Sequence, residues 1–193
     1  MVLSGLEEIC VKGFEREEPL FSLCGLKCGL CPMNVSGYCP GCGGGEGNQS
    51  CAIARCSLDH ECVQFCWDCP EYPCPSYEGF EEYDSFIPHR GRGDGIERAR
   101  KLGLDAYLAQ LREKRSMLDE LLQNYNNGRL KTFFCTAACL LTKEELRLAL
   151  DKLRSAGKSL TLKERASLAE RLLRDAAQAR GVSLKLVKKP KGV

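Results

Sequence analysis

The sequence predicts a mainly α fold in which an irregular, cysteine-rich module precedes a small C-terminal helical bundle. Two features of the 193-residue chain predict it. Eleven of its fourteen cysteines lie between residues 24 and 74, in a stretch too poor in leucine, isoleucine and valine to build a conventional core. From residue 96 onward, apolar side chains recur at three- and four-residue spacing, which is typical of amphipathic helices.

Composition divides the chain into five segments. The first holds one short amphipathic stretch at most. The connector after the cysteine-rich module ends in a turn-rich segment, His89 to Gly95, in which we expect little local order. The predicted segments are an N-terminal segment (1–23), the cysteine-rich module (24–75), the connector (76–95), a helical domain (96–181) and a basic tail (182–193).

Capping signals mark three or four helices in the C-terminal domain. A periodic apolar run leads from Leu104 to Tyr125, and residues 133–141 are apolar and rich in small side chains, so we expect them to be buried. Two capping boxes predict the starts of two further helices. The signals are Asn126-Asn127-Gly128 after the first run, the boxes of Thr142 with Glu145 and of Thr161 with Glu164, and Gly181 after the last helix.

The cysteines repeat one spacing. The pattern C-x3-C-x2-C-P occurs at residues 24–32 and again at 62–70, and Cys39 and Cys42 form a further C-x2-C pair that Gly43 follows. A tight C-x2-C turn places two thiolates on one side, and the glycine permits the positive φ that such a knuckle requires. One pair is weak support for a metal site, but three within about fifty residues predict one.

The metal is expected to be zinc. The N-terminus has no secretory signal layout, so we expect a reducing cytoplasm, where this density of cysteine indicates metal binding rather than disulfides. All-thiolate sites suit zinc and iron–sulfur clusters. The compact ferredoxin spacing is absent, and the chain has no room for the barrel of radical enzymes, so a zinc-knuckle module is favoured and an iron–sulfur cluster is the alternative. The candidate metal ligands are Cys24, Cys28, Cys31, Cys39, Cys42, Cys51, Cys56, Cys62, Cys66, Cys69 and Cys74.

The number of sites is open, because two four-thiolate sites would leave three of the eleven thiols over. We expect ligand pairs to cross between the two halves of the module, which would hold it closed. His60 is expected to face solvent, with ligation as the alternative. Cys135 and Cys139 are four residues apart in an apolar run and are expected in the helical core, and Cys10 is expected to be incidental; a ligand role stays open for all three.

The segment Cys24-Gly25-Leu26-Lys27-Cys28-Gly29-Leu30-Cys31-Pro32 resembles the opening of an uncharacterised prokaryotic family known as domain of unknown function 3795. The likeness covers roughly residues 20–115 and includes Cys51-x-Ile53-x-x-Cys56 and Cys66-x2-Cys69-x3-Pro73-Cys74. Asn48 stands where that family usually has a cysteine, and Cys62 is additional. The resemblance implies a presumed zinc-binding protein and supplies no established reaction.

Charge is distributed unevenly although the net charge is only +2. Residues 24–74 carry two basic and five acidic side chains, whereas residues 143–193 carry fourteen basic and six acidic ones. The module is therefore a poor surface for nucleic acid, and the C-terminal part is at best a weak one. No apolar run approaches the roughly 18 residues that span a bilayer, so we expect a cytoplasmic protein that contacts no membrane.

Function is less constrained than the metal site. No Ser-His-Asp pattern, HExxH, P-loop or dinucleotide fingerprint appears, so an enzyme is not indicated. We expect a non-catalytic protein with structural zinc whose module binds a protein partner. The alternatives are an iron–sulfur or thiol redox protein, and a nucleic-acid-associated zinc protein that uses its basic C-terminal helices.

Overall fold

A computed structural model describes residues 11, 13–45, 51–156 and 160–190 of the protein. Within these residues the chain is mainly helical and contains no strand, which confirms the mainly α part of the prediction, whereas the zinc-knuckle module stays a prediction. None of the helices in the described ranges has both the length and the apolar content needed to cross a bilayer. Cys10 and Asn48 lie outside the described residues.

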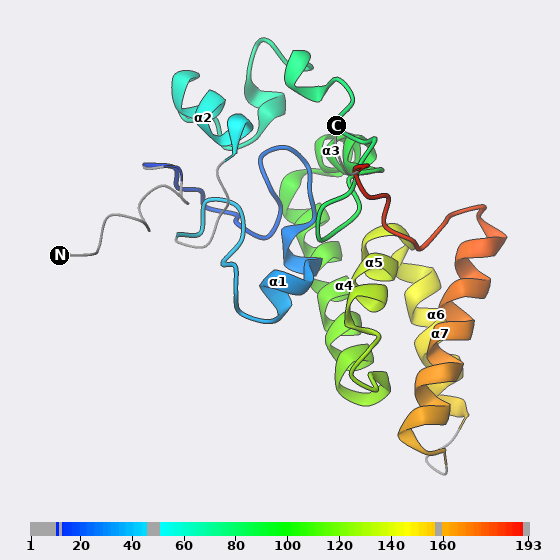
Figure 1. Ribbon diagram of the computed structural model, residues 1–193. Helices are drawn as coiled ribbons and strands as arrows, with labels where there is room; N and C mark the ends of the chain where they lie inside the picture. Colours follow the sequence, from blue (N-terminus) through cyan, green and yellow to red (C-terminus); the bar gives the residue numbers. More distant parts are fainter. Residues whose placement is uncertain (1–10, 12, 46–50, 157–159, 191–193) are drawn as a thin grey trace.

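Four helices form the predicted C-terminal bundle, and α6 and α7 lie side by side at one end of the molecule (Figure 1). The apolar faces of all four supply one core, which includes Cys135 and Cys139 as predicted. The helices are α4 (Leu104–Tyr125), α5 (Lys131–Leu140), α6 (Lys143–Ser155) and α7 (Leu162–Ala179). The largest fully buried side chains of this core are Leu118, Leu121, Phe134, Leu141, Leu146, Leu150 and Leu173.

Both predicted capping boxes are present, at the starts of α6 and α7. At α7 the Glu164 N–H donates to the Thr161 hydroxyl, and the Glu164 carboxylate accepts from the Thr161 N–H at 2.8 Å. We expect Thr161→Ala to lower the free energy of unfolding by about 1 kcal/mol, because helix N–H groups lose their acceptor. Denaturant unfolding measures this. Ser167→Ala, an exposed change within the same helix, is the control, and equal stability of the two variants would contradict a contribution from the cap.

The predicted helical run from residue 96 is divided in the structure. Helix α3 (Arg92–Leu102) begins four residues earlier than expected, within the segment predicted to have little order, and ends at Gly103. Gly103 has a φ of 86°, which the helical conformation excludes, so a new helix, α4, starts after it. The prediction of a turn-rich boundary at residues 89–95 was wrong because Gly93 and Gly95 lie inside a helix.

The connector is ordered by the C-terminal tail. Asp84 is buried, forms an ion pair with Arg90 at 2.7 Å, and accepts from the Val187 N–H at 2.8 Å. The Asp84 N–H donates in turn to the Val187 carbonyl. Arg90 also donates to the carbonyls of Ser183 and Lys185, so the tail and the connector form one unit next to α3, as the red segment in Figure 1 shows.

The cysteine-rich half consists of short helices and turns on the other side of the molecule (Figure 1). It packs against the bundle: Leu30 enters the bundle core, as does Ile87 of the connector. Phe65, together with Phe21 just before the module, packs with Tyr107 of α4. Its elements are η1 (Cys28–Leu30), α1 (Pro32–Val35), α2 (Ala52–Asp59), η2 (Cys66–Asp68) and η3 (Pro75–Tyr77).

Candidate metal centre

Ten of the eleven candidate ligands line two cavities. The first cavity has a volume of about 230 Å³. The second has a volume of only about 20 Å³, which is roughly the space of one ion. Cys62 is exposed and lines neither cavity. The first cysteine group is Cys24, Cys28, Cys31, Cys39, Cys42 and Cys51, and the second cysteine group is Cys56, Cys66, Cys69 and Cys74.

The two groups follow chain order. Cys66 and Cys69, the C-x2-C pair of the second repeat, line the second cavity with Cys56 and Cys74, and Cys66 also lies close to Cys24 of the first repeat. The predicted crossing of ligand pairs between the two halves of the module stays a prediction. The second group has as many thiols as one tetrahedral zinc site takes, and the first group has six.

The repeated sequence spacing forms the same local turn twice. The Cys31 N–H donates to the Cys28 carbonyl at 3.0 Å, and the Cys69 N–H donates to the Cys66 carbonyl at 3.1 Å. Each C-x2-C pair thus spans a 3-10 turn that directs its two side chains into one cavity. The similarity of the two turns explains why the sequence repeats C-x3-C-x2-C-P.

Backbone donors surround the sulfurs of the first group as the knuckle geometry predicts. Burial raises the pKa of the Cys31 thiol, and the N–H groups of Met33 and Asn34, which point at its sulfur, partly offset that rise. Gly43, after Cys42, has a φ of 75°, and a side chain there would meet Arg16. Such N–H groups stabilise a thiolate rather than a thiol.

Both groups are buried enough to disfavour free thiolates. Burial raises the pKa of Cys42 to about 11 and that of Cys66 to about 12. Cys28 has its pKa raised by burial and further by the nearby Cys42 and Cys24. At neutral pH these side chains are therefore thiols, and they become ligands only when a cation compensates the charge of the thiolates.

A buried arginine lies between the two groups. Arg92 is 2% exposed, and its guanidinium stacks over the rings of Tyr77 and Phe80. Within the described residues none of its three guanidinium nitrogens has a hydrogen-bond partner. Burial lowers the pKa of Arg92, whereas Cys24 of the first group and Cys66 of the second raise it by their charge. A buried cation without a partner is costly, so a nearby negative centre is expected to stabilise it.

Arg16 has a comparable position beside the first group. It is 8% exposed, and its positive charge lowers the pKa of Cys42 against the larger effect of burial. Its Nε–H donates to the Gln64 carbonyl and one Nη donates to the carbonyls of Glu18 and Phe21, whereas the other Nη has no hydrogen-bond partner among the described residues. The cysteine spacing did not identify Arg16 or Arg92, because both lie outside residues 24–75.

His60 lines the second cavity rather than facing only solvent. Its Nδ1–H donates to the Cys56 carbonyl at 2.8 Å, and its Nε2 lies 3.5 Å from the Glu71 carboxylate. The backbone hydrogen bond raises the pKa of His60, with help from Glu71. Since both ring nitrogens are engaged with other groups, His60 is placed to support Cys56 rather than to replace it.

The donor chemistry fits a thiolate-bound metal, but the side chains do not yet enclose one. Within the described residues, no group of three or more histidine, cysteine, aspartate or glutamate side chains is arranged so that it could hold a metal ion. None of the described cysteines forms a disulfide bond. Metal binding at either cavity therefore requires the thiol side chains to turn inward together.

Comparisons with known proteins add no relative. No family model matches the chain, and neither the curated proteins nor the solved structures include a significant match. The resemblance to domain of unknown function 3795 thus stays a prediction.

Proposed function

We propose that the protein is a structural zinc protein whose cysteine-rich half is held together by two thiolate-bound zinc ions. The observation that carries the proposal is the division of ten cysteines between two cavities with the unpartnered Arg92 guanidinium between them. A zinc ion with four thiolates has a net charge of −2, and the buried guanidinium supplies the opposite charge and donors toward the sulfurs.

Ligands are proposed for each site from the geometry of the turns. The second site takes all four cysteines of the second group. We assign the first site to the two C-x2-C pairs, Cys28 with Cys31 and Cys39 with Cys42, because each such pair places two thiolates on one side. Cys28 lies near the other three and also near Cys24. Cys24 and Cys51, the remaining members of the first group, then act as buried thiols beside the site.

A structural role follows from the closed ligand sets. Four protein ligands leave no open position for water or substrate, so such a site stabilises a fold and does not activate a reactant. Exposed aromatic side chains adjoin the first group: Tyr38 is 73% exposed next to Cys39, and Phe86 is 54% exposed at the first cavity. Because aromatic residues are enriched at protein interfaces, we propose that this surface binds a protein partner.

The two alternatives predict different observations. An iron–sulfur protein would be brown after anaerobic purification, whereas a zinc protein is colourless. A nucleic-acid-binding role is disfavoured by charge pairing on the C-terminal helices, where basic side chains are neutralised by carboxylates. These pairs are Arg147 with Glu113, Arg154 with Glu120, Arg174 with Glu170, and Arg180 with Glu145.

Elemental analysis of the purified protein tests the proposal. We expect two zinc ions per chain, and we expect Cys66→Ser and Cys39→Ser each to lose one, since each removes a ligand from a different site. Cys62→Ser is the matched control, because Cys62 belongs to the same cysteine-rich segment but lines neither cavity.

Three results would contradict it. Less than one zinc ion per chain in the wild type would show that the protein has no zinc centre. Stoichiometric iron would show that it holds an iron–sulfur cluster instead. Loss of zinc from Cys62→Ser, with retention in Cys66→Ser, would show that the ligand groups are wrong.

A further inference from the structure

A cationic cavity lies beside α3 and α4, and none of the ten cysteines of the two groups lines it. It has a volume of about 280 Å³ and is lined by Lys27, by residues of the connector, α3, α4 and the α5–α6 junction, and by Arg180 and Val182 after α7. Among the described residues that line it, only Asp94 is acidic. Six lining residues are basic: Lys27, Arg90, Arg98, Lys114, Lys143 and Arg180.

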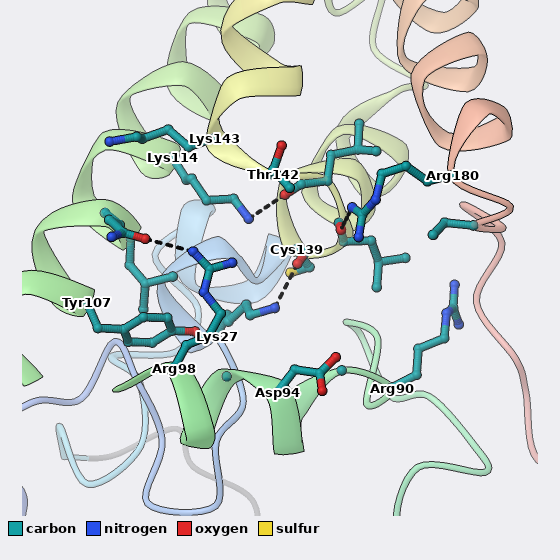
Figure 2. A pocket seen from close by; sticks show the side chains of 17 residues that line it. Lys27, Arg90, Asp94, Arg98, Tyr107, Lys114, Cys139, Thr142, Lys143 and Arg180 are labelled. Carbon is teal, nitrogen blue, oxygen red and sulfur yellow. Dashed lines mark hydrogen bonds between the residues drawn. The ribbon is translucent and has the colours of Figure 1, made fainter. Parts of the chain in front are cut away.

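Half of these cations are already neutralised by carboxylates. Each of the three makes an ion pair with a carboxylate that balances its charge. Figure 2 shows the Lys143 ammonium pointing toward the edge of the view, away from the middle of the cavity. The pairs are Arg90 with Asp84 at 2.7 Å, Lys143 with Glu113 at 3.1 Å, and Arg180 with Glu145 at 3.3 Å.

The other three cations, Lys27, Arg98 and Lys114, have no such partner. Within the described part of the chain no carboxylate forms an ion pair with any of them. Figure 2 shows the three side chains pointing into the same space from three different elements. Each donates to a neutral oxygen: Lys27 to the Cys139 carbonyl, Lys114 to the Leu141 carbonyl, and Arg98 to the Gln110 amide.

The proximity of three positive charges disfavours protonation of the two lysines. Lys114 is only 8% exposed, and burial lowers its pKa to about 7, with further lowering by the positive charges of Lys27 and Arg98. Like charges that face one cavity without a counterion are costly, and a bound anion removes that cost.

We propose that this cavity binds a small phosphate-bearing molecule through Lys27, Arg98 and Lys114. A phosphate dianion matches a cluster of excess positive charge, and each lysine retains two N–H donors beyond its carbonyl contact. The ring of Tyr107 and the side chains of Leu111 and Val182 supply apolar walls for an organic part of the ligand. The volume, close to the lower end of ordinary ligand pockets, limits that part to a small group.

Titration calorimetry with the full-length, zinc-loaded protein tests the proposal. The probes are inorganic phosphate and phenyl phosphate, in buffer adjusted with KCl to constant ionic strength. We expect saturable binding of both, and we expect Arg98→Gln and Lys114→Met each to weaken it by about tenfold or more, because each removes a charge-assisted hydrogen bond. Lys27 is left unchanged because it adjoins Cys28.

Arg100→Gln is the matched control. Arg100 lies two residues from Arg98 on the same helix, pairs with Glu97, and does not line the cavity. Its phosphate affinity should stay within twofold of the wild type. Absence of saturable phosphate binding in the wild type, equal weakening in all three variants, or tighter binding of succinate than of phosphate would overturn the proposal. Each readout is independent of the zinc count.

Discussion

Chelation of the bound metal is expected to unfold the cysteine-rich half of the protein while the helical bundle keeps its fold. Residues 13–77 contain only small apolar clusters, and the larger of their buried side chains contact either cysteines or α4. Structural zinc sites contribute on the order of 10 kcal/mol to the folding of small domains, which is more than such clusters supply. The core formed by α4 to α7 contains no proposed ligand and should persist.

Hydrogen exchange followed by mass spectrometry resolves this effect by segment. After chelation, amides of α2 and η2 should exchange at rates near those of an unfolded chain, whereas amides around Leu118, Phe134 and Leu173 should remain protected. Before chelator is added, the zinc-loaded Cys62→Ser variant should show the same exchange rates as the zinc-loaded wild type. Unchanged protection of the cysteine-rich half after complete removal of metal would show that sulfur–metal bonds are not what holds it.

Replacing Lys114 by methionine is expected to stabilise the protein by roughly 3 kcal/mol at pH 7 in phosphate-free buffer. The pKa of Lys114 is lowered from 10.5 to about 7 by burial first, then by Lys27 and Arg98. A shift of this size corresponds to about 4 to 5 kcal/mol, of which the lost hydrogen bond to the Leu141 carbonyl offsets about 1 kcal/mol.

The gain should depend on pH with a defined sign. Between about pH 7 and pH 10.5 the unfolded chain binds a proton at Lys114 that the folded chain does not, so this lysine makes wild-type stability increase with pH. Below pH 7 both states are protonated and the full cost remains. The advantage of Lys114→Met is therefore largest below pH 7 and falls by about 1.4 kcal/mol per pH unit toward pH 10.

Denaturant unfolding at several pH values measures this difference. The other charged groups near Lys114 are Lys27, Arg98, Cys139 and Glu145, and they are the same in both proteins, so their own titration cancels to first order. Lys152→Met, at an exposed position of α6, should show no comparable pH-dependent gain. A variant less stable than the wild type at pH 6 would contradict the inference that Lys114 is a buried cation under strain.

Local signals in the sequence predicted the helical half well. The capping boxes at Thr142 and Thr161 are fixed by residues three apart, and the burial of Cys135 and Cys139 follows from the periodicity of one helix. The start of α3 was missed because packing of Ile96 and Ala99 and stacking of Arg92 outweigh the low helix propensity of Gly93 and Gly95.

The clustering of the candidate cysteines was predictable from the sequence, but their arrangement was not. Spacing identified the C-x2-C turns, since each is closed by one local hydrogen bond. The partition of the cysteines depends on how residues 24–51 and 56–74 pack, which no local spacing encodes. Long-range contacts place Arg92 near the cysteines and bring Lys27, Arg98 and Lys114 together, so no local pattern predicts either arrangement. Zinc itself remains a proposal.

The two hydrogen bonds between Asp84 and Val187, one from the Asp84 N–H to the Val187 carbonyl and one from the Val187 N–H to the Asp84 carboxylate, span more than a hundred residues. During synthesis, residues 76–91 leave the ribosome long before the tail segment that they contact, residues 183–187, has been made. This stretch, which carries Tyr77 and Phe80 beneath Arg92, can reach its final shape only once residues 183–187 have emerged. Maturation of the metal centre would accordingly be completed late, after translation has passed the last helix.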